Sequence, residues 1–371
     1  MAVAIDIYST YFMMALIREK GTVYSFLKDR YFSQSEDFKT ENVFLDYDDG
    51  EGNLMAPFVI PRIGKVPMER VGYETRELAP AYIAPSRPLS IDILTKRLAG
   101  ESLASTLTPA QRERTYLTGD LDFLDKAITR REEWMCANTL LKNACHMEHV
   151  GDRVDASKSI AMDVYYYDRD AQGRGDNPGV FTKSAKWEVG TASKRGTWYK
   201  DVCKQAASLY DSGREATDLV VGADVGDMIL NDPWVVSMLD NRRIELGTIN
   251  PQWQENGVVY IGKLNFSGIM LDIFVYRGTY QEKNASGKLV TKPYFPKTAA
   301  LIAAPGTGII RYGAVTQIEM DKQTYTRTGK RIPKHLVDET ANAKETILTA
   351  RPIASPIMKS PWRACEDVFA T

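Results

Sequence analysis

Histidine and cysteine, the residues that most often bind metals or act as nucleophiles, are scarce in this chain. Its 371 residues include 3 histidines and 4 cysteines, and the cysteines, at positions 136, 145, 203 and 365, are too scattered for a disulfide framework. We interpret them as reduced thiols, as in a cytosolic protein. His146 and His149 lie near Cys145, but no second ligand cluster is spaced to complete a tetrahedral metal site. We therefore predict no metal and no cofactor.

The chain also lacks an excess of charge of either sign and any long apolar run. It has 47 Lys and Arg residues against 48 Asp and Glu residues, and the two signs are interspersed. A direct nucleic-acid-binding protein is expected to carry a basic patch, so this balance does not support DNA binding. No segment approaches the ~20 apolar residues of a membrane span. The apolar N-terminus is interrupted by Asp6 and has no basic leader, so we expect a soluble protein not exported by a standard signal.

Signatures of catalysis are missing as well. Residues 304–313 (APGTGIIRYG) are rich in glycine, but Arg311 stands where the dinucleotide-binding pattern needs its third glycine. No Gly-Lys pair is followed by Ser or Thr, and there is no G-x-S-x-G elbow. The turn Gly222–Asp227 could bind a ligand in an α/β enzyme or binding protein, although a tight turn capped by Asp227 explains it equally simply. We predict that the chain is not an enzyme.

The longest feature that is present is a predicted helix over Thr108–Val150. Thr108 and Gln111 have capping-box spacing, and Pro109 suits the first helical position. The helix could break or be re-capped at residues 118–120 before its main run from Asp120 to His146. Its apolar residues predict two buried rows: the first contains Leu117, Leu121, Leu124, Ile128 and Met135, and the second contains Ala127, Trp134, Leu141 and Cys145.

Two N-terminal segments are rich in apolar or proline residues but have little core of their own. Residues 1–36 read as an arm with a helix near residues 9–19, and their many aromatic side chains must pack on their own domain or on a neighbouring subunit. Residues 37–97 read as extended, with strands near 42–47 and 54–60, and six prolines exclude regular central strands. Such a segment is more plausible lying on a partner than as a floppy surface insertion, which is the alternative.

The rest of the chain alternates strands and helices. We predict strands at 159–167 and 218–221, an amphipathic helix ending near Tyr210, and a helix over Asp227–Leu239 that is kinked or re-capped at Asp232-Pro233. Further strands follow at 257–262, 269–280, 298–304 and 342–351, with a hairpin at NASGK. The predicted fold class is α+β.

Several stretches, in this order, resemble a known family. They are FKTENVFLDY, APAYIAPSRPLSIDILTKRLAGE, AITRREEWMCANTLL, GADVGDMILNDPWVVSMLDNRRIELG, IFVYRGTY and KTAALIAA. Their order and spacing resemble those of the major capsid proteins of tailed double-stranded DNA phages, whose fold is named for phage Hong Kong 97. More narrowly, the chain resembles the lambda-like major head proteins, the capsid protein E family.

The resemblance implies a four-part organisation: an N-terminal arm (1–36), an extended E-loop region (37–97), a peripheral domain with a spine helix (98–180, completed by about 351–371) and an axial domain (181–350). It implies self-assembly as hexamers and pentamers into an icosahedral virion capsid, formed in the bacterial cytoplasm around double-stranded DNA without sequence-specific binding. Scaffolding, portal and decoration proteins are the implied partners, and no membrane is involved. The alternative with the same fold is an encapsulin-like compartment shell.

The resemblance also implies where subunits meet. We expect intersubunit contacts from the arm, the loop and the axial lobe, at Tyr8, Phe12, Tyr24, Phe26, Arg62, Lys65, Glu69, Arg70, Glu74, Arg76, Asn241, Arg242 and Arg243. Some members of the fold cross-link a loop lysine to a neighbour's asparagine. Lys65 has a suitable place, but the lambda-like branch does not imply a cross-link, and a solvated lysine is the default. One apolar row of the long helix would seat it on its own sheet, while the other would receive an arm or loop.

Overall fold

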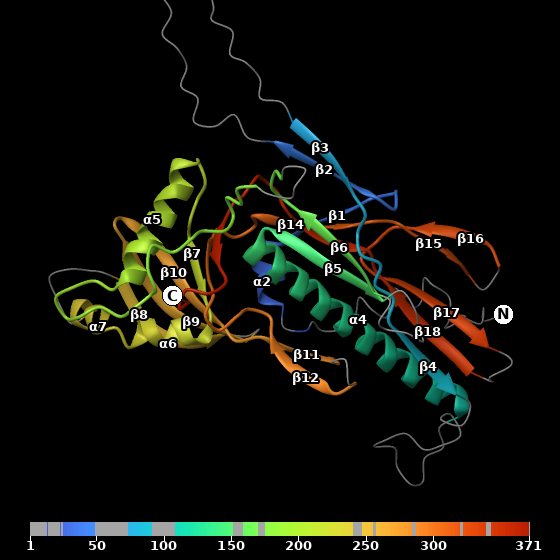
Figure 1. The fold of residues 1–371 in the computed structure, drawn as a ribbon. Coiled ribbons are helices and arrows are strands. Elements are labelled where there is room, and N and C mark those ends of the chain that lie inside the picture. The colour runs from blue at the N-terminus through green and yellow to red at the C-terminus, as the bar shows by residue number, and fades with distance from the viewer. Residues whose placement is uncertain are drawn as a thin grey trace, which may run out of the picture.

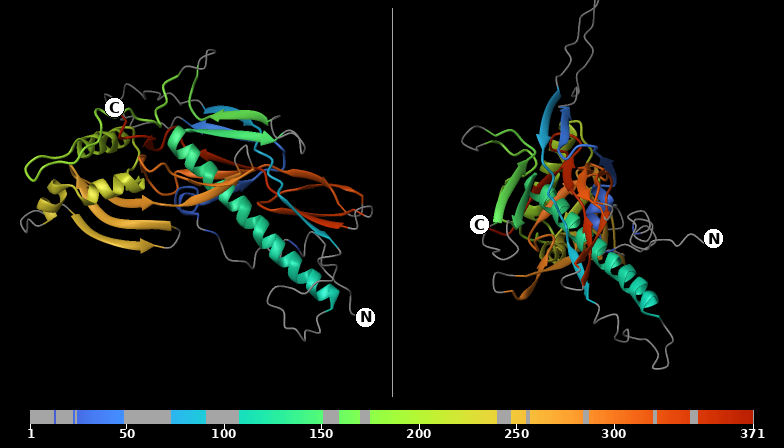
Figure 2. Two further views of the ribbon diagram at one scale, coloured as in Figure 1. Left: turned by 60° about the horizontal axis from the view of Figure 1, so that its bottom comes forward. Right: turned by 90° about the vertical axis from the view of Figure 1, so that its right-hand side faces the viewer.

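The computed structural model describes residues 13, 23, 25–48, 73–90, 108–150, 159–169, 175–239, 247–254, 257–283, 287–319, 322–338 and 343–370. The molecule is elongated (Figure 1), and a long helix, α4 (Pro109–Lys142), runs along one half of it. The other half holds the shorter helices α5 (Thr197–Asp211), α6 (Ala223–Leu230) and α7 (Pro233–Leu239). Both views in Figure 2 show α4 lying obliquely beside the hairpins of its half.

Helix α4 begins where the sequence predicts. The Thr108 backbone N–H donates to Gln111 Oε1 at 2.9 Å, and the Gln111 N–H donates to Thr108 Oγ1 at 3.4 Å, which completes the capping box. The helix then continues through Gly119 without a break. Its 34 residues would span roughly 50 Å at ~1.5 Å per residue, so it is the longest rigid element among the described residues.

The predicted end of this helix, between His146 and Val150, is wrong. Asn143 adopts the left-handed conformation, with φ of 51°, and ends the helix after Lys142. The chain then forms strand β5 (Ala144–Val150), which pairs antiparallel with β6 (Ser159–Tyr165). Cys145 and Met147 are buried while His146 and Glu148 are exposed, so the burial period here is two, as in a half-covered strand.

A six-stranded sheet forms the core of the half that carries the short helices. Its strand order is β20-β13-β7-β10-β9-β8. β7 and β10 pair in parallel, and the other pairs are antiparallel. The strands are β7 (Asp218–Val221), β8 (Gly247–Gln254), β9 (Val258–Phe266), β10 (Ile269–Tyr276), β13 (Ala300–Ala303) and β20 (Arg363–Cys365). Apolar residues of α5, α6 and α7 pack on this sheet in one cluster.

The helix predicted over Asp227–Leu239 starts earlier than expected and is divided. α6 begins at Ala223, so Asp227 lies inside it and does not cap it; the carboxylate of Asp227 faces Arg277 at 3.3 Å instead. The predicted re-capping at Asp232-Pro233 is confirmed. Asp232 Oδ1 accepts a hydrogen bond of 2.9 Å from the Trp234 backbone N–H at the start of α7.

Small sheets and hairpins surround α4 in the other half. Two sheets have three strands, in the orders β1-β14-β19 and β17-β18-β4, and four pairs stand alone, namely β2-β3, β5-β6, β11-β12 and β15-β16. Their bounds are β1 (Gln34–Asp37), β2 (Val43–Asp48), β3 (Tyr73–Leu78), β4 (Ser86–Ser90), β11 (Thr279–Lys283), β12 (Leu289–Pro293), β14 (Gly308–Tyr312), β15 (Val315–Ile318), β16 (Thr324–Arg327), β17 (Ile332–Asp338), β18 (Ala343–Thr349) and β19 (Pro352–Pro356).

In the described part of the proline-rich region, the strand that contains a proline, β4 (Ser86–Ser90), is not a central strand, as the sequence predicts. β2 confirms the predicted strand near residues 42–47, and Pro88 lies in β4, at the edge of its sheet, where a missing N–H is tolerated. The predicted strand at 54–60 lies outside the described residues. So does the predicted helix near 9–19, apart from Met13, which is helical and buried.

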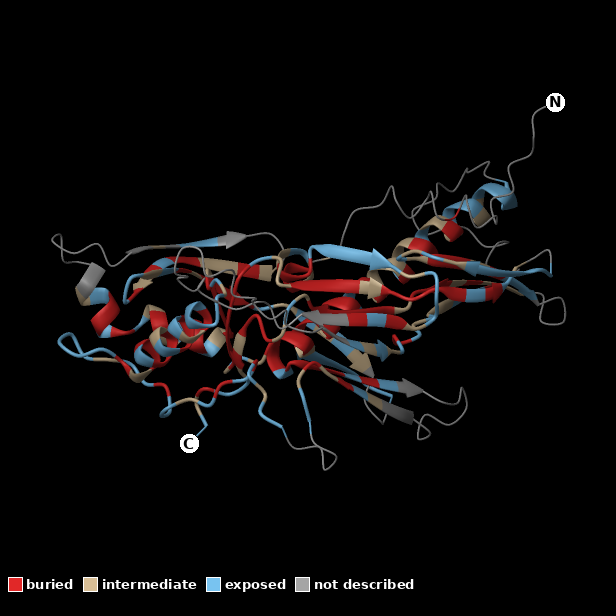
Figure 3. Ribbon diagram, turned by 90° about the horizontal axis from the view of Figure 1, so that it is seen from above, coloured by how far each residue is buried: buried red, intermediate tan, exposed pale blue. Residues whose placement is uncertain are grey.

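Burial separates the two apolar rows of α4. Every member of the first row, from Leu117 to Met135, is buried, and Leu124 and Ile128 pack against Leu348 and Ala350. In the second row Leu141 and Cys145 are buried, whereas Ala127 and Trp134 are only partly covered. Figure 3 shows buried residues in the central elements of both halves. One face of α4 is therefore committed to the core, and part of another remains accessible.

Candidate functional site on the long helix

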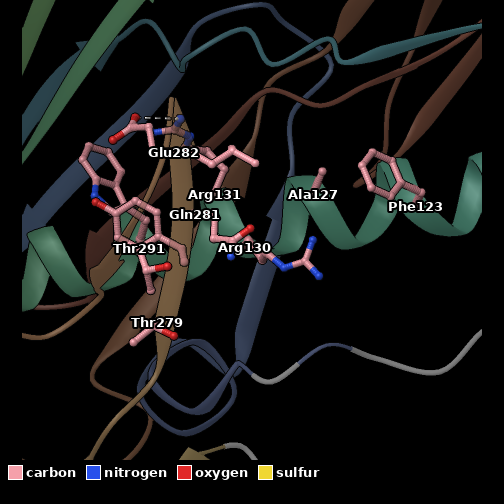
Figure 4. Close-up of a pocket in the computed structure, with 11 residues that line it drawn as sticks. Phe123, Ala127, Arg130, Arg131, Thr279, Gln281, Glu282 and Thr291 are labelled. Atoms are coloured by element: carbon pink, nitrogen blue, oxygen red, sulfur yellow. Dashed lines mark ion pairs between the residues drawn. The ribbon is translucent and has the colours of Figure 1, made fainter. Parts of the chain in front are cut away.

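The accessible face of α4 forms one wall of a groove, and the hairpin β11–β12 forms the other. The cavity has a volume of about 690 Å³. Figure 4 shows Phe123, Ala127, Arg130 and Arg131 spread along α4, with the hairpin strand beside one end of this row and Arg131 directed to Glu282. The other residues that line the cavity are Trp134 on α4 and, on the hairpin, Thr279, Tyr280, Gln281, Glu282, Leu289 and Thr291. We call this site the α4 groove.

The α4 groove combines exposed apolar groups with positive charge. Phe123 is 48% exposed and Leu289 is 59% exposed, which is unusual for side chains of this size at a concave site. The Arg131 guanidinium lies 3.7 Å from the Glu282 carboxylate, so that charge is partly balanced. Arg130 forms no ion pair within the part of the chain that the structure describes. The groove therefore suits an extended apolar segment that also carries a negative charge.

The opposite side of α4 buries two adjacent glutamates that hold the short helix α2 (Phe26–Tyr31). Glu132 is 1% exposed and has two cationic partners. The Lys28 Nζ atom lies 2.6 Å from its Oε2, and the Arg331 Nη1 atom lies 2.6 Å from its Oε1. Burial alone would raise the pKa of Glu132, but the two cations outweigh it and lower the pKa to about 2. Glu132 is thus an ionised member of a buried charge network.

Glu133 is equally buried but has neutral hydrogen-bond partners. Its Oε1 accepts from the Leu27 backbone N–H at 3.0 Å and from the Tyr276 hydroxyl at 2.7 Å, and its Oε2 accepts from the Lys28 N–H at 2.9 Å. Two N–H groups of the first turn of α2 therefore find their acceptor on another helix. Burial is the largest influence on Glu133 and raises its pKa to about 7, although the three hydrogen bonds act in the opposite direction.

A third carboxylate holds the other end of α2. Asp218, fully buried at the start of β7, accepts from Arg30 Nε at 2.5 Å and Nη2 at 3.0 Å, and from the Tyr31 hydroxyl at 2.9 Å. We call Glu132, Glu133 and Asp218 together the α2 clasp. Because Glu132 and Glu133 come from α4 while Asp218 comes from the six-stranded sheet, α2 joins the two halves of the molecule.

Sequence reasoning missed the α2 clasp. Neither Glu132 nor Glu133 is among the residues that the sequence indicates as functional, although both lie within the predicted helix. One signal was available, because Glu132 falls between Ile128 and Met135 at helical spacing, inside the buried first row. The partners could not be found from spacing, since Arg331 is 199 residues away from Glu132.

The structure describes only three of the thirteen predicted contact residues. Phe26 is buried within its own subunit, where its ring lies 5.5 Å from that of Phe274 and 5.7 Å from that of Tyr276. Glu74 and Arg76 lie on β3, and Arg76 pairs with Asp168 at 2.6 Å. The remaining ten lie outside the described residues: Tyr8, Phe12, Tyr24, Arg62, Lys65, Glu69, Arg70, Asn241, Arg242 and Arg243. Their intersubunit role stays a prediction.

The histidines near Cys145 lie on a strand, not at a helix end. His146 on β5 pairs with Asp163 on β6, and Cys145 points into the core on the other face. Within the described ranges, no group of three or more His, Cys, Asp or Glu side chains is arranged to hold a metal ion. No helix of the described chain is both long and apolar enough to span a membrane.

The glycine-containing turn at Gly222–Asp227 is filled by the chain itself. A Cβ atom on Gly222 would lie 2.2 Å from the Lys297 carbonyl oxygen, and one on Gly226 would lie 2.5 Å from Val275 Cγ2. Both glycines are therefore required by close packing of backbone and side chains. This geometry supports the structural interpretation of the turn.

Comparison with solved structures identifies the fold. The structure is similar to that of a protein described as a prophage capsid protein of E. coli CFT073, with a TM-score of 0.60 and 17% identity, covering 96% of this chain and 98% of that one. It is also similar to a phage-related protein of Bordetella bronchiseptica, with a TM-score of 0.50 and 10% identity over 97% and 98% of the two chains. The mixed α+β fold is that of phage capsid proteins.

Sequence comparison then identifies the family. The model for phage major capsid protein E matches residues 9–358. The major capsid protein of Escherichia phage lambda is 24% identical over 364 residues, covering 94% of this chain and 95% of that protein, and that of Escherichia phage N15 is 24% identical over 355 residues. The chain belongs to the phage major capsid protein E family, which confirms the resemblance. It is a non-enzymatic component of the virion that forms the icosahedral head of a tailed phage.

Proposed function

We propose that this chain builds the head as hexamers and pentamers in which the arm and the extended loop of each subunit lie on its neighbours. The α4 groove is the observation that carries this proposal. It leaves Phe123 and Leu289 about half exposed on a face of the longest described helix, which is costly for a subunit that stays alone. A neighbouring segment in the groove would cover them, as in obligate interfaces.

We assign the groove to the extended loop of a neighbouring copy. The sequence from the end of β2 into the loop combines acids at Asp48, Asp49 and Glu51 with the apolar run Leu54–Ile60. Those acids complement Arg130, and the apolar run matches Phe123, Ala127 and Leu289. The β2–β3 pairing brings the two ends of this loop together, with Asp48 opposite Tyr73.

The finer organisation follows the Hong Kong 97-like plan. In this proposal residues 1–36 are the arm, 37–97 contain the extended loop, 98–180 with about 351–371 form the peripheral domain around α4, and 181–350 form the axial domain. The elongated shape supports it, since α4 and the six-stranded sheet lie in opposite halves. Scaffolding, portal and decoration proteins complete the head, which encloses double-stranded DNA without reading its sequence.

Ala127→Glu tests the groove. Glutamate is a good helix former, so α4 is expected to fold, but the new carboxylate lies three and four residues before Arg130 and Arg131, where it would neutralise their charge and repel the acids of the neighbour's loop. At a cost of ~3 kcal/mol, each subunit contact weakens about 100-fold, and we expect no closed shells by electron microscopy when the variant is expressed with its scaffolding protein.

Thr115→Glu is the matched control, since it places the same charge on an exposed position of α4 outside the groove. Circular dichroism should show equal helix content in the two variants. Wild-type shell yield from Ala127→Glu would overturn the assignment of the groove.

A further inference from the structure

The three carboxylates of the α2 clasp differ in how their charge is balanced. Glu132 contacts Lys28 and Arg331, and Asp218 contacts Arg30 through two hydrogen bonds. Glu133 contacts two backbone N–H groups and a tyrosine hydroxyl, all of which are neutral. An ionised carboxylate that is fully buried without a cation is costly, even when it is hydrogen-bonded. Glu133 is therefore the member of the clasp whose charge depends on its surroundings.

Neighbouring ionisable groups do not supply the missing positive charge. The Lys28 ammonium is directed to Glu132, and Asp29 on α2 adds a negative charge that raises the pKa of Glu133 further. The groups that face or influence Glu133 are Lys28 and Asp29 from α2, Glu132 and Cys136 from α4, Tyr276 from β10, and Tyr294 just after β12. Burial raises the pKa of the Cys136 thiol and of both tyrosines, so these three groups stay neutral near pH 7.

We propose that docking of α2 onto α4 is coupled to proton uptake by Glu133, so that the α2 clasp tightens in mild acid and loosens above neutral pH. When α2 leaves, water reaches Glu133 and its carboxylate is solvated. When α2 docks, the neutral acid is favoured. The Tyr276 hydroxyl suits both states, because it donates to a carboxylate and can accept from a carboxylic acid.

The direction follows from linkage. The pKa of Glu133 is about 7 when α2 is docked, against a reference value of 4.5. A raised pKa means that the stabilisation is fully present below 4.5 and is lost as the pH rises through 7. Between pH 6 and pH 8 the equilibrium constant for docking should fall about tenfold, because one pKa unit corresponds to a factor of ten.

The consequence for assembly rests on the proposed function, whereas the coupling itself belongs to the single subunit. α2 lies inside the proposed arm (residues 1–36) and comes shortly after residues 1–24, so its docking fixes the point on the subunit at which those residues join it. The experiment is therefore done on the unassembled full-length chain. Its outcome is independent of whether the α4 groove binds a loop.

Amide hydrogen exchange of Leu27 and Lys28 measures docking directly, since their N–H groups are the ones that Glu133 accepts. After correction for intrinsic exchange, we expect their protection to fall about tenfold from pH 6 to pH 8. The amides of Val202 and Leu209 in α5, in a separate apolar cluster, are the internal reference. Protection that changes less than twofold relative to this reference would overturn the proposal.

Two variants complete the test. Glu133→Gln keeps the shape but cannot ionise, so the protection of α2 should become independent of pH. Tyr276→Phe removes a hydrogen bond that lowers the pKa of Glu133, so the midpoint of the transition should move to higher pH. If Glu133→Gln does not fold, the midpoint in Tyr276→Phe decides. A midpoint that stays in place, or an unchanged pH dependence in Glu133→Gln, contradicts the coupling.

Discussion

Adjacent residues with the same chemistry acquire different roles on α4 because different partners reach them. Glu132 receives two cations from distant parts of the chain, and its pKa falls to about 2. Its contribution to stability is present above the reference value of 4.5 and is lost as the pH falls toward 2. The next residue, Glu133, has a raised pKa of about 7, so its contribution to stability is lost as the pH rises through 7. Burial alone therefore does not determine how a carboxylate responds to pH.

Arg331→Met tests the buried charge network. The substitution leaves Glu132 with Lys28 as its one remaining cation and also removes hydrogen bonds to Asp125 and Thr129. We expect the free energy of unfolding to fall by about 3 kcal/mol, which is typical of breaking a buried ion pair. Urea unfolding of the unassembled subunit measures it.

The control is Lys126→Met, because Lys126 forms an i,i+4 pair with Asp122 at 2.7 Å on the more accessible side of the same helix. Such a pair contributes roughly 0–1 kcal/mol. Equal losses of stability in the two variants would show that the Glu132 network is no more important than a surface pair.

At the scale of elements, the start of α4 could be predicted and its end could not. Thr108, Pro109 and Gln111 form a local signal that is complete within four residues. The end depends on Asn143, a residue type that adopts the left-handed conformation only in some contexts. Strand β5, which follows, has 7 residues, and its alternation of buried and exposed side chains is too short to be distinguished from the longer helical pattern before it. The helical spacing of its apolar residues predicts the buried first row of α4. The α2 clasp could not be predicted in this way, because it depends on contacts such as Lys28–Glu132, which are 104 residues apart.

Substitutions at Asn143 separate the two reasons for this helix end. Its side chain donates to Asn177 Oδ1 at 3.2 Å and to Ser360 Oγ at 3.3 Å, and both glycine and alanine remove these hydrogen bonds. Alanine at this position is also strained by the positive φ, whereas glycine is not. We expect Asn143→Ala to be less stable than Asn143→Gly by about 1 kcal/mol, measured by thermal unfolding. Equal stability would mean that the left-handed backbone imposes no constraint.

At the scale of the whole molecule, the α2 clasp predicts different effects for two N-terminal deletions, one that retains α2 and one that removes it. Deleting residues 1–22 retains α2 but removes the buried side chain of Met13, so we expect a folded, less stable subunit that no longer assembles. Deleting residues 1–31 also removes the buried side chains of Phe26, Leu27 and Tyr31 and leaves Glu133 and Asp218 without these partners. That variant should lose several kcal/mol of stability.

Electron microscopy of assemblies and urea unfolding of subunits distinguish the two deletions. The expected pattern is loss of shells in both, with the larger loss of stability in the longer deletion. Shells formed at wild-type yield without residues 1–22 would contradict a role for the arm between subunits. A shorter deletion that is as unstable as the longer one would show that residues 1–22 belong to the core of their own subunit.

Strands that are distant in the sequence pair with each other, and this determines when each sheet can be completed during synthesis. β1 pairs with β14, which pairs in turn with β19 (Pro352–Pro356), and β20 (Arg363–Cys365) completes the six-stranded sheet beside β13. A growing chain cannot finish either sheet until residues 352–365 have emerged from the ribosome. Pairings between such distant segments also form slowly. We therefore expect a subunit to complete both sheets, and to become competent to assemble, only after residue 365 has been translated.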